Sequence, residues 1–373
     1  MQTTVAVTHD VAQPFELMEV SLSDELRFGE VRVKLAATGL CHTDLSVRDG
    51  YLPFAMPAVL GHEGSGIVEA VGAGVQKVSP GDHVVMTYPH CGICDQCQSG
   101  KPTYCPKTQQ WIFSGTGKRD KSLLSSDKYE NLSSAFMGQS SFSQYALVTE
   151  DGVVKVKKDV PIELLGPLGC GFQTGAGAVL RSLAVPLGSS LAVFGSGSVG
   201  MAAIMAARVS GVAEIIAVDI IQNRLKQALE LGATHTVNAQ EIDPVEAIRE
   251  VTGGRGVAYS LWANGIPEVL SQAFRCLSQT GICGVVGVAP MGSKLEIDIY
   301  ELFKGKTIRG ILAGDTIPDI LIPQLIELYQ QGRFPLDEIV KYYEFKDINK
   351  AAKDLEEGRT IKPILKFNLS KRQ

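Results

Sequence analysis

Short apolar runs and amphipathic segments alternate through the middle of this chain. The apolar runs, which we interpret as buried strands, cover residues 191–194, 214–218, 235–238, 257–261 and 281–288. Segments with the pattern of helices lie between them at 199–208, 223–231, 244–251 and 267–278. Strands that alternate with helices are typical of a doubly wound parallel sheet, so we expect an α/β fold here.

The first third of the chain has a different pattern. Short valine-containing runs at 31–36, 66–71 and 82–86 are separated by turns that contain Pro53, Pro57, Pro80, Pro89 and Pro102. This texture indicates β-strands joined by irregular loops. Near the end, residues 320–331 have the pattern of an amphipathic helix and residues 364–367 that of a strand. A chain of 373 residues with two such different patterns of predicted secondary structure is expected to form two domains.

Composition and charge exclude several classes of function. The chain is 45% hydrophobic and 20% charged with a net charge of −5, so it lacks the basic footprint of a nucleic-acid-binding protein. Residues 182–207 include no charged side chain, but Pro186 and several glycines favour a buried strand, turn and helix over a membrane span. Residues 1–7 do not have the pattern of a secretory signal, and we expect a cytoplasmic protein.

A glycine fingerprint lies between the first apolar run and the helical segment after it. Gly195, Gly197 and Gly200 have the spacing that permits a tight turn, lets the backbone approach a pyrophosphate and brings the helix close to the sheet. The N-terminus of that helix would offer free N–H groups to the phosphates. Asp219 ends the next strand and can accept hydrogen bonds from ribose hydroxyls, which favours NAD over NADP. Arg224, a few residues further on, could instead accept the 2′-phosphate of NADP.

Four of the eight cysteines lie in one short segment. Cys91, Cys94 and Cys97 are each separated by two residues, and Cys105 follows after seven more. Four thiolates at this spacing suit a closed tetrahedral zinc site that stabilises a loop. An iron–sulfur cluster and unmetallated redox thiols are the alternatives, although the last interval is longer than in the bacterial ferredoxin run. The spacing fits metal binding in a reducing compartment better than a disulfide framework.

A second set of candidate ligands is scattered along the chain. Cys41, His62 and Cys170 occur in the strings Gly-Leu-Cys-His-Thr-Asp, Gly-His-Glu-Gly and Gly-Cys-Gly-Phe. Two thiolates and one imidazole leave the fourth position of a tetrahedral zinc open, which catalysis requires. The residues alone make these three candidates only, because a lone histidine is more often a satisfied core or surface residue than a ligand.

Together, these motifs resemble those of the zinc-dependent medium-chain alcohol dehydrogenases. The resemblance covers essentially the whole chain and includes the cysteine quartet, residues 138–145, the fingerprint with Asp219 and residues 358–365. Within the family, the chain most resembles the aryl-alcohol (benzyl-alcohol) and geraniol dehydrogenases. The resemblance implies a GroES-like catalytic domain formed by residues 1–173 and 315–373, a Rossmann NAD-binding domain formed by residues 174–314, and an active site between them.

The resemblance also implies roles for individual residues. It makes Cys41, His62 and Cys170 the ligands of a catalytic zinc, and the quartet the ligands of a structural zinc. Thr43 would hydrogen-bond the substrate oxygen, Asp44 would orient the zinc-binding histidine, and Glu63 would approach the metal from behind. The residues expected to bind the cofactor are Gly195, Gly197, Val199, Gly200, Asp219, Arg224, Val288 and Lys362. Those expected to line the substrate pocket are Leu52, Thr87, Phe136, Met137, Val288 and Leu312.

The implied reaction is NAD-dependent oxidation of a primary aryl or allylic alcohol to its aldehyde, through a zinc-bound alkoxide and hydride transfer. Benzyl alcohol, cinnamyl alcohol and geraniol are the expected type of substrate, because Thr87 stands where relatives often have a large aromatic residue. The family passes a proton to a histidine at the position that Ser46 occupies here. We hypothesise that His42 contacts the pyrophosphate and assists proton exit.

Two other functions are compatible with the sequence. Oxidation of S-(hydroxymethyl)glutathione, the formaldehyde adduct, is compatible with the long segment 111–136. A non-enzymatic binding protein on a dehydrogenase fold would be favoured by loss of a zinc ligand, but all three ligand candidates are present. Residues 294–309 resemble the subunit contact of the family, so we expect a homodimer or homotetramer, with an internal sheet edge as the alternative. We expect small alcohols and aldehydes as partners, and neither nucleic acid nor a membrane.

Overall fold

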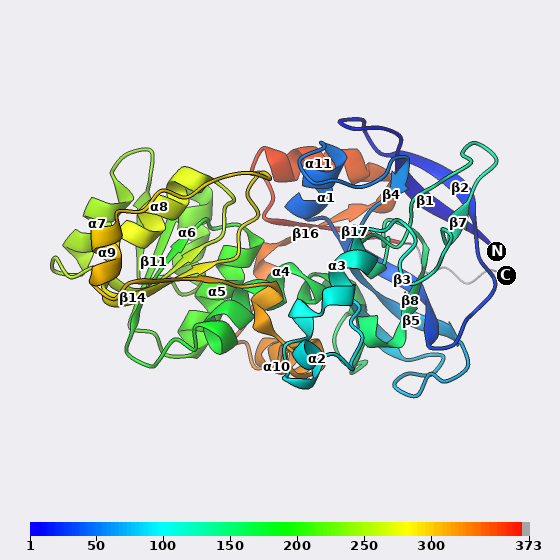
Figure 1. Ribbon diagram of the computed structural model, residues 1–373, viewed down its shortest axis with the longest axis horizontal. Coiled ribbons are helices and arrows are strands. Elements are labelled where there is room, and N and C mark those ends of the chain that lie inside the picture. Colours follow the sequence, from blue (N-terminus) through cyan, green and yellow to red (C-terminus); the bar gives the residue numbers. More distant parts are fainter. Residues whose placement is uncertain (368–373) are drawn as a thin grey trace. The chain divides into compact units, whose positions relative to one another are not determined.

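Figure 1 shows the computed structural model of the protein, which describes residues 1–367. The chain divides into two compact units. The first unit consists of residues 1–170, 317–326 and 339–367. The second unit consists of residues 171–316 and 327–338.

The second unit is built on a parallel sheet with the strand order β12-β11-β10-β13-β14-β15. Its strands are β10 (Ser190–Phe194), β11 (Glu214–Asp219), β12 (His235–Asn238), β13 (Val257–Trp262), β14 (Leu277–Val285) and β15 (Thr307–Gly310). Its helices include α4 (Gly171–Gly177), α5 (Ser198–Val209), α6 (Gln222–Leu231), α7 (Pro244–Val251), α8 (Pro267–Arg275) and α9 (Ile299–Phe303). The chain runs outward from β10 to β12 and then returns to β13, so the doubly wound sheet predicted from the alternating pattern is confirmed.

The glycine fingerprint forms the turn between β10 and α5. Gly195 has a φ of +103°, which only glycine adopts readily. A Cβ atom at Gly200 would lie 1.8 Å from the carbonyl oxygen of Gly195, so no side chain fits there. Helix α5 packs on β10 and β11 through buried small residues, as the sequence pattern predicts.

The uncharged stretch at residues 182–207 includes β10 and most of α5, as the interrupting glycines predict. Within residues 1–367, no helix is both long enough and apolar enough to cross a membrane.

Two strands of the sheet differ from the sequence expectation: β14 ends at Val285 rather than at residue 288, and β15 was not predicted. The helix predicted over residues 267–278 ends at Arg275, and β14 begins at Leu277 rather than at residue 281. The strand begins early because Leu277 pairs with Val257, after which the register shifts before Tyr259 pairs with Ile282. This irregularity interrupts the alternation of side chains, and the apolar pattern therefore misplaced the boundary.

The first unit contains a sheet in the order β16-β17-β3-β5-β6-β9, with β8 paired to β3, and a smaller antiparallel sheet in the order β4-β1-β2-β7. The strands are β1 (Gln2–Thr8), β2 (Glu16–Leu22), β3 (Glu30–Gly39), β4 (Ala58–Val59), β5 (Glu63–Val71), β6 (His83–Met86), β7 (Leu124–Ser125), β8 (Tyr145–Thr149), β9 (Val153–Val156), β16 (Val340–Glu344) and β17 (Lys362–Lys366). The helices include α1 (His42–Arg48), α2 (Asp95–Gln98), α3 (Pro106–Ile112) and α11 (Ile348–Glu356), and α10 (Pro318–Gln330) contributes residues to both units.

Strand β3 brings together segments that are far apart in the sequence. Along one edge it pairs with β5, where Gly39 lies opposite Glu63. Along its other edge it pairs first with β8 and then with β17, where Gly39 lies opposite Ile364. The end of β3 therefore lies between the beginning of β5 and the C-terminal strand β17, two residues before Cys41.

Candidate functional site

The three scattered ligand candidates meet in the first unit. Cys41 precedes α1, His62 directly precedes β5, and Cys170 follows the short 3-10 helix η5 (Gly166–Gly169). One ligand atom from each of them and one carboxylate oxygen of Glu63 all lie within 4.8 Å of one another. The fold thus gathers two thiols, an imidazole and a carboxylate at the end of β3.

Asp44 fixes the orientation of the His62 ring. Its fully buried carboxylate lies 2.8 Å from Nδ1 of His62 and accepts the backbone N–H groups of Cys41 at 2.9 Å and Gly61 at 3.1 Å. A neutral imidazole that donates from Nδ1 has its lone pair on Nε2. This Nε2 is buried and has no hydrogen-bond partner in the structure. A buried lone pair beside two thiols fits a metal ligand, and the donor set suits zinc.

The two thiols of the cluster differ in acidity. The hydrogen bond from Cys170 and the positive charge of Lys362 lower the pKa of Cys41 well below its usual value, although burial opposes them. The same hydrogen bond, together with burial, raises the pKa of Cys170 well above its usual value. Without a metal, the protein therefore favours a state in which Cys41 is ionised and Cys170 is protonated. A divalent cation between the sulfurs would allow both to ionise.

A buried ion pair lies behind these ligands. The ammonium of Lys362 is 2.9 Å and 2.8 Å from the two carboxylate oxygens of Glu63 and 3.4 Å from the carbonyl oxygen of Leu40. Burial raises the pKa of Glu63. Burial by itself would lower the pKa of Lys362, but the neighbouring carboxylate outweighs it and raises that pKa. The sequence had predicted a cofactor contact for Lys362, and the pairing with Glu63 was not foreseen.

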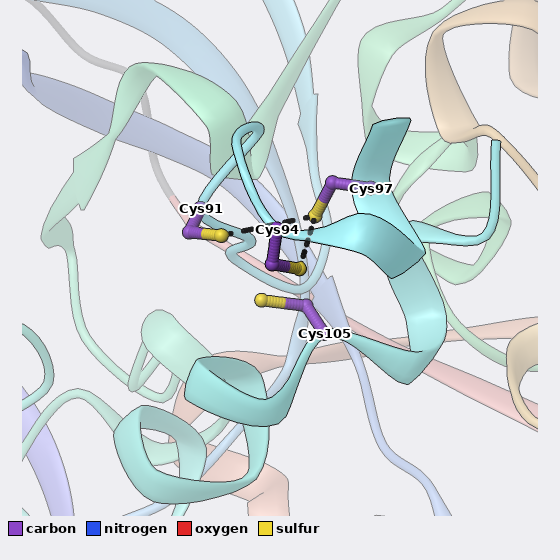
Figure 2. Close-up of side chains that lie close together, drawn as sticks. All are labelled: Cys91, Cys94, Cys97 and Cys105. Atoms are coloured by element: carbon purple, nitrogen blue, oxygen red, sulfur yellow. Dashed lines mark hydrogen bonds between the residues drawn. The ribbon is translucent and has the colours of Figure 1, made fainter. Parts of the chain in front are cut away.

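The four clustered cysteines converge in a loop of the first unit (Figure 2). Cys94 precedes α2, Cys97 lies within α2, and Cys105 precedes α3. Sγ of Cys97 lies 4.0 Å from Sγ of Cys91 and 3.5 Å from Sγ of Cys94. Tetrahedral zinc with Zn–S bonds of about 2.3 Å requires sulfurs about 3.8 Å apart, so this quartet fits the ion.

The quartet also has thiols of unequal acidity. Burial raises the pKa of Cys105, but the backbone of Cys91 and the hydroxyl and N–H of Thr108 outweigh it and lower that pKa to about 6. Burial and the thiol of Cys94 raise the pKa of Cys97 to about 12. Binding of a metal at this site would therefore release protons, and acid would favour its loss.

The expected cofactor residues lie in the second unit, apart from Lys362. Asp219 is buried, and its carboxylate accepts the backbone N–H groups of Ser196 at 2.6 Å, Ile220 at 2.8 Å and Ile221 at 3.0 Å. Gly197 precedes α5, and Val199 is half-buried in its first turn. Arg224 is half-buried in α6, with its Nε unpaired, and Val288 is exposed. The carboxylate of Asp219 is thus held at the carboxyl end of β11, next to the fingerprint turn.

The expected pocket residues are divided between the units. Phe136 is buried in the first unit, and its ring meets the His62 ring edge-on at a centroid distance of 5.6 Å. Thr87 is also buried there, and its hydroxyl donates to the carbonyl of Gly169 at 3.0 Å. Leu52 and Met137 are half-buried in the first unit. Val288 and Leu312 are exposed in the second unit.

Helix α1 carries the residues expected to handle the substrate oxygen and the proton. Oγ1 of Thr43 lies 3.7 Å from Sγ of Cys41, so the hydroxyl is next to the ligand cluster. His42 is exposed in the first turn of the helix, and Ser46 is half-buried one turn later. The structure thus places a hydroxyl at the cluster and an imidazole beside it on the surface.

Three residues near the cluster were missed by the sequence reasoning. Phe54 and Phe113 surround Phe136, with ring centroids 5.1 Å and 6.3 Å from it. The side-chain amide of Gln139 contacts the backbone on both sides of Glu63. Phe54 is set among prolines in a loop and Gln139 is a single polar residue among serines, so neither has a periodic pattern that would mark it.

Comparison with known proteins identifies related families for both parts of the chain. Residues 27–158 match the alcohol dehydrogenase GroES-like domain family, and residues 198–331 match the zinc-binding dehydrogenase family. Geraniol dehydrogenase of Castellaniella defragrans is 40% identical over 364 residues, which is 97% of this chain and 97% of that protein.

Two solved structures are similar throughout. A zinc-binding alcohol dehydrogenase domain protein from Burkholderia ambifaria has a TM-score of 0.95 at 51% identity, covering 98% of this chain and 99% of that one. Benzyl alcohol dehydrogenase from Acinetobacter calcoaceticus has a TM-score of 0.95 at 47% identity, with the same coverage. Enzymes of this family use zinc and a nicotinamide cofactor, and the two cysteine-containing clusters and the fingerprint match those requirements. The chain therefore belongs to the zinc-dependent medium-chain alcohol dehydrogenases, as the resemblance of its motifs predicts.

Proposed function

We propose that the protein oxidises primary aryl or allylic alcohols to aldehydes with NAD, at a zinc ion bound by Cys41, His62 and Cys170. The observation that carries this proposal is the buried Nε2 of His62, which has no partner and lies in a cluster with two thiols. When bound, zinc would lower the pKa of an alcohol hydroxyl, and the nicotinamide would accept the hydride. The similarity to a geraniol dehydrogenase and a benzyl alcohol dehydrogenase supports the substrate class.

The residues around the cluster have distinct roles in this proposal. Asp44 holds the His62 ring with its Nε2 lone pair toward the thiols, and accepts a hydrogen bond from the backbone of Cys41 at the same time. Thr43 supplies the hydroxyl that would hydrogen-bond the alcohol oxygen. His42, exposed at the beginning of α1, would contact the pyrophosphate and assist proton exit, because the hydroxyl of Ser46 is not a base near neutral pH as an imidazole is.

An aromatic wall next to His62 supports a preference for flat substrates. Phe136 meets the His62 ring edge-on, and Phe54 meets Phe136 edge-on at 5.1 Å. Such arrangements favour aromatic or unsaturated groups through the ring quadrupole and apolar contact. The hydroxyl of Thr87 donates to the Gly169 carbonyl, so its polar group is already hydrogen-bonded. In this proposal, the small side chain of Thr87 also leaves more room in the pocket than an aromatic residue would. We assign Leu52 and Met137 to the rest of the pocket.

The anchored carboxylate of Asp219 supports NAD as the cofactor. Three backbone N–H groups hold it at the end of β11, where it would accept the ribose hydroxyls and repel a 2′-phosphate. We assign residues 174–314 to the NAD-binding domain, and residues 1–173 with 315–373 to the domain that carries both zinc sites. The quartet of Cys91, Cys94, Cys97 and Cys105 would hold the structural zinc.

Assembly and location follow from other features. Strand β15 lies at the edge of the parallel sheet, and Ile299, Tyr300 and Phe303 of α9 are exposed nearby in sequence. A strand at the edge of a sheet, with exposed apolar residues near it in the sequence, supports a homodimer or homotetramer. None of the eight cysteines forms a disulfide, which supports a reducing compartment such as the cytoplasm.

A substrate comparison tests the proposal. We expect kcat/KM with NAD to be at least about tenfold higher for benzyl alcohol, cinnamyl alcohol or geraniol than for ethanol, because apolar contact contributes about 1–3 kcal/mol for each methylene-sized group. Comparable values for ethanol would contradict the substrate class. Formaldehyde with glutathione is assayed in parallel, and a higher kcat/KM for that adduct would replace the proposal with the glutathione-dependent reaction.

A further inference from the structure

Gln139 links the pocket wall to the candidate zinc ligands. It follows the short 3-10 helix η2 (Phe136–Gly138), and its side chain is buried. Its Nε2 donates to the carbonyl oxygen of His62 at 2.9 Å, and its Oε1 accepts the N–H of Gly64 at 3.2 Å. The amide therefore holds the two peptide groups that flank Glu63, the first of which joins Glu63 to His62.

These contacts fix which way the amide points. A backbone carbonyl can only accept a hydrogen bond and a backbone N–H can only donate one, so the reversed amide would lose both contacts. Both groups lie on the same side of the strand, where a neighbouring strand would ordinarily satisfy them. The adjacent strand β6 pairs with β5 only from Ser65 onward. Gln139 thus makes hydrogen bonds with His62 and Gly64 in the place where β6 no longer pairs with this segment.

The backbone around Gln139 is held firmly. Met137 and Ser140 have positive φ angles of 50° and 51°, which are unfavourable for side chains other than glycine. The hydroxyl of Ser140 donates to the carbonyl of Val59 at 2.6 Å and accepts the N–H of Phe136 at 2.9 Å. A strained backbone conformation persists only where surrounding contacts hold it in place. The backbone of this segment is therefore fixed, and it fixes the position from which the Gln139 side chain extends.

We propose that Gln139 is a positioning residue for the catalytic zinc: its amide sets the backbone position of His62 and Glu63 and thereby the direction from which the imidazole and the carboxylate face the metal. This inference rests on the zinc ligands of the proposed function. Groups that orient metal ligands from behind typically change metal affinity by about 10–100-fold when they are removed. The effect should be confined to the site at His62, because the quartet of cysteines has no contact with Gln139 among the hydrogen bonds of the described residues.

The experiment compares zinc loss from the two sites of the full-length holoenzyme. Gln139→Met keeps the length of the side chain but removes both hydrogen bonds, and Gln139→Glu keeps the contact to Gly64 while placing an oxygen against the His62 carbonyl. Ser143→Ala is the matched control, because Ser143 is equally buried in the same segment and its hydroxyl contacts Thr3 and Tyr145 instead. Zinc release is followed with a colorimetric chelator, and the structural site in the same unit is the internal reference. Cobalt substitution adds an absorption spectrum of the ligand geometry.

We expect Gln139→Met to lose one zinc at least about tenfold faster than wild type and to change the cobalt spectrum, while the second zinc is released at the wild-type rate. Gln139→Glu should behave similarly, and Ser143→Ala should match wild type. Release of the first zinc at the wild-type rate would overturn the inference, as would equal acceleration at both sites or failure of both Gln139 variants to fold. A wild-type protein that never holds a second zinc would overturn the proposed function itself, which separates the two failures.

Discussion

The buried pair of Lys362 and Glu63 provides a quantitative test of the structure. The two side chains are at most 1% exposed, and the ammonium lies within 2.9 Å of both carboxylate oxygens. In protein without a metal at the neighbouring ligand cluster, Lys362→Met would leave the buried carboxylate of Glu63 without its counter-ion, which costs about 3–5 kcal/mol of the free energy of unfolding. Replacing both partners, as Lys362→Met with Glu63→Leu, removes the unpaired charge and should cost about 1 kcal/mol or less.

Urea unfolding of the first unit measures these differences. Trp111 and Trp262 are the two tryptophans of the chain, one in each unit, so Trp262→Phe leaves a single reporter in the first unit. Lys128→Met is the control, because the exposed pair with Glu16 at 3.4 Å should contribute less than about 1 kcal/mol. The reasoning is refuted if Lys362→Met costs no more than this control, or if the double variant is less stable than Lys362→Met.

Three further predictions concern carboxylates with defined partners. Asp44→Asn turns the N–H₂ group of the amide toward either His62 or a backbone N–H, which leaves a buried group without a hydrogen bond and costs about 1–3 kcal/mol of stability. It should also weaken zinc binding by about 10–100-fold, measured by equilibrium competition with a chelator. Unchanged zinc affinity would contradict the role of Asp44. Asp219→Ser should lower the ratio of kcat/KM for NAD to that for NADP by at least about tenfold, because a hydrogen bond to a charged group contributes about 1.5–3 kcal/mol, and an unchanged ratio would remove Asp219 from cofactor selection. Hydrogen bonds from Tyr343, with Arg359 and Lys341, lower the pKa of Asp354 from about 3.8 to about 2 against the effect of burial. Its stabilising contribution is therefore present above pH 4 and is lost as the pH falls toward 2. The difference in stability between wild type and Asp354→Asn should shrink over that range in pH-dependent urea unfolding, and a constant difference would contradict the shift.

Local sequence patterns predicted the parallel sheet well. The strand, glycine turn and helix around Gly195 and Gly200 depend on interactions within about ten residues, so their spacing is visible in the chain. The boundary between α8 and β14 was misplaced because the shift in register after Leu277 depends on the pairing partner Val257. The strands β1 and β17 were wholly or partly missed for a similar reason, since their burial comes from distant segments. Hydrophobic periodicity shows which face of a helix or strand is buried better than it shows where the element begins and ends.

The candidate site shows the same division between local and distant information. The strings around Cys41, His62 and Cys170 identified the ligand candidates through family resemblance, and the structure brings their ligand atoms within 4.8 Å, together with Glu63. The pairing of Glu63 with Lys362 spans 299 residues and depends on how β17 docks on β3. Such a contact has no signature in either segment alone.

The zinc content of purified protein tests the central claim most directly. We predict two zinc ions per chain in wild type, and one in His62→Ala together with loss of alcohol oxidation. Cys283→Ala, which removes a buried thiol outside both clusters, should retain two ions and activity. Two zinc ions in His62→Ala, or undiminished turnover by that variant, would contradict the assignment of the metal to Cys41, His62 and Cys170.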